Sequence, residues 1–186
     1  MSSSPRESGL PLARPTAEDL IIPADTRMEM FGYLSEAGIW TQISPGQIRR
    51  MVAQWPAEDT TPAEVAGLLA TSRQLVVCSY YCYEFLVVAV LVALQATETA
   101  LRMHLTDGSS KQTLTKLIER ARANGTLSEE VADDLHLARH LRNDLSHPRY
   151  QGAWTYGMAL PLIERSHRFS SFLFTTVTTS EDPSLP

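Results

Sequence analysis

Apolar residues recur at the three- and four-residue spacing of an α-helix through most of the chain. In residues 44–55, for example, Ile48, Met51, Val52 and Trp55 fall on one face. Strand-like segments do not alternate with the helical ones. The pattern therefore predicts an all-α, up-and-down bundle of four to five helices, preceded by an extra N-terminal helical segment. The predicted helical segments are 44–55, 61–77, 80–105, 111–125, 128–147 and 156–177.

Residues typical of helix ends flank several of these segments. Ser44 and Thr61 each precede a proline, the arrangement expected of an N-cap followed by the first helical position. Glu64 stands three positions after Thr61 and would complete a capping box there. Asn124 and Gly125 end the fourth segment, because glycine readily adopts the left-handed conformation that closes a helix.

One stretch, residues 75–94, is apolar enough to suggest a membrane span. It lacks basic residues at its flanks and continues without a break into polar residues at helical spacing. We therefore favour a buried central helix over a span, and expect no stable membrane insertion. Cys78 and Cys82 lie four residues apart in this stretch, which predicts two small buried thiols rather than a disulfide or a metal site.

Composition divides the chain into four parts. Residues 1–25 are rich in serine and proline and predict a flexible leader, and residues 179–186 predict a disordered tail. Between them lie an N-terminal helical extension, 26–60, and the bundle, 61–178. The net charge of −5 over 186 residues excludes a broadly basic nucleic-acid binder but leaves room for a local basic groove. The start lacks a signal-peptide pattern, so we expect a cytoplasmic protein.

The helix predicted over 128–147 carries the candidate chemistry. On a helical wheel its core stripe includes Arg142 near the centre, where a charge must be paired or face an interface. The apolar members of that stripe are Val131, Leu135, Ala138, Leu141 and Leu145. The opposite side carries a ladder of His136, His140, Asn143 and His147.

Three interpretations of this helix remain open on the residues alone. It is a solvated polar face with one arginine bound to a neighbouring helix, or His136, His140 and Asp144 hold a metal ion. Alternatively, Arg142 binds phosphate oxygens while His147 moves protons, which suits cleavage of RNA. Those two side chains lie about 140° apart on an ideal helix, so a distorted helix end or a twofold partner would have to bring them together.

The sequence Arg142-Asn143-Asp144-Leu145-Ser146-His147 has the form R-N-x-x-x-H and is followed by a proline. It resembles the R-x(4–6)-H motif of HEPN domains (higher eukaryotes and prokaryotes nucleotide-binding), and the resemblance covers roughly residues 62–177. It implies a HEPN-like helical bundle that forms a homodimer, with the two motifs meeting at a cleft.

The resemblance further implies a metal-independent endoribonuclease of a toxin, phage-defence or stress system, with RNA as substrate and no cofactor. Arg142 and His147 would then be catalytic, and Asn143 would position the substrate or the partner's motif. A partner antitoxin or regulatory protein is a further expectation, although Tyr150 stands one residue later than the tyrosine that is modified in some family toxins. The alternative is a non-catalytic HEPN-like module for binding and dimerisation.

Four further residues are candidates for a supporting role. Glu98 lies on a polar stripe of the long helix together with Arg102, and it would pair either with Arg142 across the bundle or with Arg102 on its own helix. The others extend a local positive patch around the motif: Arg139, His140 and Arg149.

Overall fold

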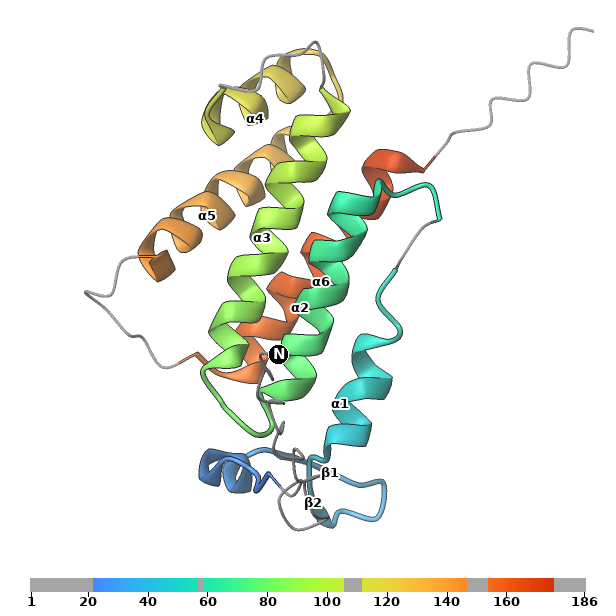
Figure 1. Cartoon of the computed structure of the whole chain (residues 1–186), viewed down its shortest axis with the longest axis vertical. Helices are drawn as coiled ribbons and strands as arrows, with labels where there is room; N and C mark the ends of the chain where they lie inside the picture. The colour runs from blue at the N-terminus through green and yellow to red at the C-terminus, as the bar shows by residue number, and fades with distance from the viewer. Residues whose placement is uncertain (1–21, 57–58, 106–111, 147–153, 176–186) are drawn as a thin grey trace, which may run out of the picture.

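The chain folds into a helical bundle, seen in a computed structural model that describes residues 22–56, 59–105, 112–146 and 154–175 (Figure 1). Its elements are η2 (Thr26–Met30, a 3-10 helix), β1 (Gly32–Leu34), β2 (Trp40–Gln42), α1 (Pro45–Val52), α2 (Ala63–Cys78), α3 (Phe85–His104), α4 (Leu114–Ala123), α5 (Glu129–Ser146) and α6 (Tyr156–Phe174). The predicted all-α bundle is thereby confirmed, with α2–α6 as the bundle and α1 in the N-terminal extension.

Helix α3 is the central element. It packs against α2 and α6 on one side and against α5 and α4 on the other (Figure 1). Both apolar clusters of the core draw on it, because Val90 lies in one and Leu101 in the other. The predicted core stripe of α5 packs there too, since Leu135 and Ala138 are buried.

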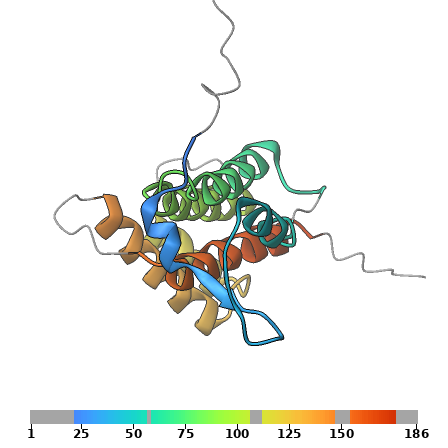
Figure 2. The same ribbon diagram turned by 90° about the horizontal axis from the view of Figure 1, so that it is seen from below.

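The N-terminal extension is less helical than expected. Helix α1 forms as predicted, and its capping box is complete: Ser44 accepts a hydrogen bond from the Gln47 amide, and the Gln47 side chain accepts one from the Ser44 amide. Before it, however, β1 and β2 pair as an antiparallel hairpin that lies across one end of the bundle (Figures 1 and 2). The hairpin was missed because each strand has only three residues, too few for a periodic pattern.

The apolar stretch 75–94 is not one helix. Helix α2 ends at Cys78 and α3 begins at Phe85, later than the expected start near residue 80. In the turn between them, the Tyr83 amide donates to the Asp25 carboxylate. The prediction of two buried thiols is wrong, because Cys78 is exposed and Cys82 partly exposed, both as free thiols.

By length and composition, helix α3 itself is apolar enough to cross a membrane, and half of its most apolar window is buried within the bundle. Its buried residues include Leu86, Val90 and Leu101.

The start of α2 also differs from the prediction. Its N-cap is Pro62, without a side-chain cap, and the Thr61 hydroxyl is buried without a hydrogen-bond partner among the described residues. The end of α4 is as predicted, since Gly125 adopts a positive φ of 77° just after the cap residue Asn124.

Candidate functional site around Arg142

Helix α5 carries Arg142 on the side that packs against α3. Ala138, one turn earlier, is buried, and the Arg142 side chain is 33% exposed, so the guanidinium lies at the edge of the core. A cation in this position requires a partner, because partial burial removes the water that would otherwise solvate it. The sequence predicted this requirement from the helical wheel.

That partner is Glu98 on α3. Arg142 Nη1 donates to Glu98 Oε2 at 2.6 Å, and the carboxylate is only 19% exposed. The other carboxylate oxygen accepts from Arg102 Nη2 at 2.9 Å. The two alternatives that the sequence left open for Glu98 therefore both occur, with one carboxylate bridging two guanidinium groups.

Arg102 in turn connects the site to the segment before α4. Its Nη1 donates to the carbonyl of Gln112 at 2.9 Å. The network thus joins α3, α5 and the residues that lead into α4, and it fixes the orientation of Arg142 through charge-assisted hydrogen bonds. Because the guanidinium is already held in one orientation, it loses little further side-chain entropy when it forms hydrogen bonds.

The other predicted residues of α5 lie around this centre. Asn143 and His140 are exposed. Arg139 Nη2 lies 2.8 Å from His140 Nε2, so the side chains of these two residues interact directly. His147 and Arg149, as well as Tyr150, lie outside the described residues. The structure therefore brings Glu98 to Arg142, and the separation of Arg142 from His147 stays a prediction.

One histidine of the ladder, His136, interacts with a neighbouring helix. His136 Nε2 contacts Glu119 Oε1 of α4 at 2.9 Å, and this hydrogen bond lowers the pKa of the Glu119 carboxyl. Within residues 22–56, 59–105, 112–146 and 154–175, no group of three or more histidine, cysteine, aspartate or glutamate side chains is placed to hold a metal ion.

A histidine that sequence reasoning overlooked is fully buried in α6. The ring of His167 lies against that of Trp55, with centroids 5.1 Å apart. Nearby, Arg73 Nη2 donates at 2.8 Å to the carbonyls of both Trp55 and Pro56. Burial, with a smaller effect from the Arg73 charge, lowers the pKa of His167 to about 4, although the Pro56 carbonyl opposes the shift.

His167 is therefore neutral at pH 7, and its burial keeps it from exchanging protons with a substrate. Its place on the wheel, four residues after the buried Ile163, was the signal that could have revealed it.

No family model, curated protein or solved structure matches the chain. By its fold the protein is an all-α helical bundle. Its candidate site is one half-buried arginine, held by a carboxylate that a second arginine shares.

Proposed function

We propose that the protein is a metal-independent endoribonuclease of the HEPN type that acts as a homodimer. The observation that carries the proposal is the anchoring of Arg142 by Glu98 at 2.6 Å, within the sequence R-N-x-x-x-H. Anchoring supports catalysis because a transition state is best stabilised by donors that need not reorganise. Arg139 and Arg149 would add positive charge for the RNA backbone.

The proposed reaction needs only groups that the chain and RNA supply. The His147 imidazole removes the proton from a 2′-hydroxyl, and the 2′-oxygen attacks the adjacent phosphorus. The bond from phosphorus to the 5′-oxygen breaks, and the leaving oxygen takes up a proton from an imidazolium. The products are a 2′,3′-cyclic phosphate and a 5′-hydroxyl, while Arg142 binds the charged phosphate oxygens.

Two copies would share the site. On an ideal helix Arg142 and His147 point about 140° apart, so the arginine of one copy would act with the histidine of the other. The proposed setting is a cytoplasmic toxin, phage-defence or stress system, in which an antitoxin or regulatory protein restrains the nuclease.

The test is cleavage of single-stranded RNA in the presence of a chelator. We expect Arg142→Ala and His147→Ala each to slow cleavage about 100-fold or more. Arg49→Ala is the matched control, because Arg49 is an exposed arginine on α1. The cyclic phosphate end should be found on the products.

Cleavage that survives both substitutions would remove these residues from the proposed roles. Glu98→Gln adds a finer readout, because it keeps the shape of the side chain but removes the charge that holds Arg142. Because Glu98 positions Arg142, this substitution should lower the turnover number more than the affinity for RNA.

A second candidate is a non-catalytic helical module for binding and dimerisation. It is favoured by the same 2.6 Å contact, since the Glu98 carboxylate already occupies a position that a phosphate would need on Arg142. In that case the wild-type chain does not cleave RNA, and Arg142→Ala and Glu98→Ala each lower the free energy of unfolding by about 2 kcal/mol, because each removes a charge-assisted hydrogen bond between α3 and α5.

A further inference from the structure

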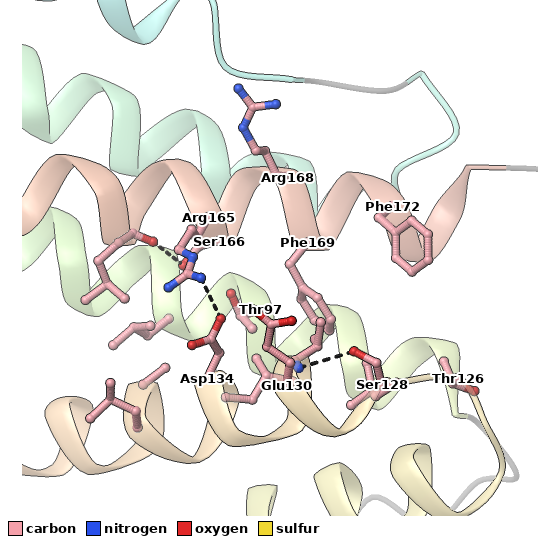
Figure 3. A pocket seen from close by; sticks show the side chains of 17 residues that line it. Thr97, Thr126, Ser128, Glu130, Asp134, Arg165, Ser166, Arg168, Phe169 and Phe172 are labelled. Atoms are coloured by element: carbon pink, nitrogen blue, oxygen red, sulfur yellow. Dashed lines mark hydrogen bonds and ion pairs between the residues drawn. The ribbon is translucent and has the colours of Figure 1, made fainter.

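A groove of about 600 Å³ runs between α5 and α6, with α3 as its floor (Figure 3). Leu94 lies on the floor, Leu135 and Ala138 are on the α5 wall, and Leu162 and Phe169 are on the α6 wall. Figure 3 shows Phe169 pointing into the groove from α6. The two walls both pack against α3, so the groove is where a further helix would complete the bundle.

Large, exposed apolar side chains also lie at the outer edge of this groove. Leu137 on α5 is 59% exposed, and Phe172 on α6 is 67% exposed. Together with the apolar interior, they form a continuous surface that is more typical of an interface than of a solvated face. Its apolar character indicates a protein occupant that brings apolar side chains of its own.

The charges on the two walls have opposite signs. The α5 wall carries Glu130 and Asp134, and the α6 wall carries Arg165 and Arg168. Arg168 is paired with Glu164 on its own helix, and its side chain extends away from α5.

At the middle of the groove Arg165 Nη2 contacts Asp134 Oδ2 at 2.7 Å, so that one ion pair crosses from wall to wall (Figure 3). The two side chains are 64% and 40% exposed, and an ion pair this exposed contributes at most about 1 kcal/mol. It opens at little cost when another partner offers the same contacts.

We infer that the groove binds a second copy of this chain through a twofold axis that runs parallel to the groove. Rotation about that axis places each α5 over the α6 of the other copy, so that Asp134 of one copy faces Arg165 of the other. An axis across the groove would instead place α5 over α5 and oppose like charges. Electrostatic complementarity therefore selects the first arrangement.

The ion pair across the groove agrees with this axis. Asp134 and Arg165 lie at the same level along the groove, and rotation about a parallel axis preserves that level. Each Asp134 therefore lies over the Arg165 of the other copy. The two intramolecular pairs, one in each copy, exchange for two intermolecular pairs, and Leu137 and Phe172 become buried. The inference goes beyond the proposed function, because the groove is a different face from the site around Arg142 and the inference holds equally for a non-catalytic module.

The test uses charge reversal and sedimentation equilibrium. We expect the wild-type chain to be a dimer, and Asp134→Arg and Arg165→Glu each to weaken it at least about tenfold, because each opposes like charges between the walls. An equimolar mixture of the two variants should form a heterodimer, since its contacts pair arginine with aspartate and arginine with glutamate. The double variant should dimerise by itself. Arg49→Glu, at an exposed position of α1, is the matched control.

Circular dichroism of each variant checks that the helices are retained. A monomeric wild-type chain, a dimer that neither reversal weakens, or a mixture that stays monomeric would each overturn the inference. Leu137→Gln tests the apolar rim and should also weaken the dimer, and a dimer unchanged by it argues against burial of the rim. RNA cleavage is measured separately. If the protein dimerises through the groove but does not cleave RNA, only the proposed nuclease function is contradicted.

Discussion

The buried imidazole of His167 should make the stability of the protein depend on pH between 7 and 4. In the native state its pKa is lowered to about 4, chiefly by burial, whereas in the unfolded chain it should return to about 6.5. As the pH falls through this window, the unfolded state takes up a proton that the native state does not. Stability is therefore present above pH 6.5 and is lost as the pH falls towards 4.

The magnitude follows from the two pKa values. Each pKa unit corresponds to about 1.4 kcal/mol, so the loss relative to pH 7 is about 2 kcal/mol at pH 5 and about 3 kcal/mol at pH 4. The fixed positive charge of Arg73 lowers the pKa of His167 in the same direction as burial. A loss of this size is a large part of the stability of a domain.

The assay is urea unfolding of the wild-type chain and His167→Leu at several pH values. Leucine keeps the volume roughly and removes the titrating group, so the difference between the two free energies of unfolding isolates His167. That difference should move by about 3 kcal/mol in favour of the variant between pH 7 and pH 4. His140→Gln is the control for removal of an exposed imidazole, since His140 lies on the surface of α5.

Proton NMR supplies an independent check, because the His167 ring signal should stay in its neutral position down to about pH 4. A difference in stability that is constant with pH, or a ring that titrates near pH 6.5, would refute the account of this site.

Four further outcomes test the packing. Gly67→Ala should raise the free energy of unfolding by about 0.5–1 kcal/mol, because an added Cβ meets open space on a helix; no gain in urea denaturation would contradict this. Gly32→Ala should disrupt the hairpin, because the new Cβ would lie 2.4 Å from the carbonyl oxygen of Thr41; tryptophan fluorescence should change while helical circular dichroism persists. Burial raises the pKa of Tyr156 to about 12, so its absorbance should titrate only near that pH. Tyr156→Phe should cost about 1 kcal/mol by removing the 2.6 Å hydrogen bond to Ser79, and an unchanged stability would argue against that bond.

Local pattern was sufficient for much of the fold. The spacing of apolar residues predicted the helices, and the capping residue Ser44 and the terminating Gly125 are where the sequence placed them. These features depend on groups within a turn or two of each other, so the chain encodes them locally. The need for a partner at Arg142 followed from its place on the core stripe.

Other features needed the tertiary structure. The sequence predicts only a short break between helices at residues 78–79 of the apolar stretch 75–94. In the structure the turn runs from residue 79 to 84, and within it the Tyr83 amide donates to the distant Asp25 carboxylate. Likewise, Cys78 is the last residue of α2 and is exposed, although the apolar residues around it predicted a buried thiol. Periodicity indicates which side of a helix or strand is apolar. It does not indicate which distant side chain will form a hydrogen bond with a backbone amide.

The sequence by itself determined that the chain is a bundle of amphipathic helices with an arginine, an asparagine and a histidine near the end of one of them. Only the tertiary structure decided that Glu98 serves both Arg142 and Arg102, and that α5 and α6 leave a charged, apolar groove between them. The reason is physical: residues 44 apart in sequence meet only when α3 and α5 pack, and the crossing of whole helices sets that distance.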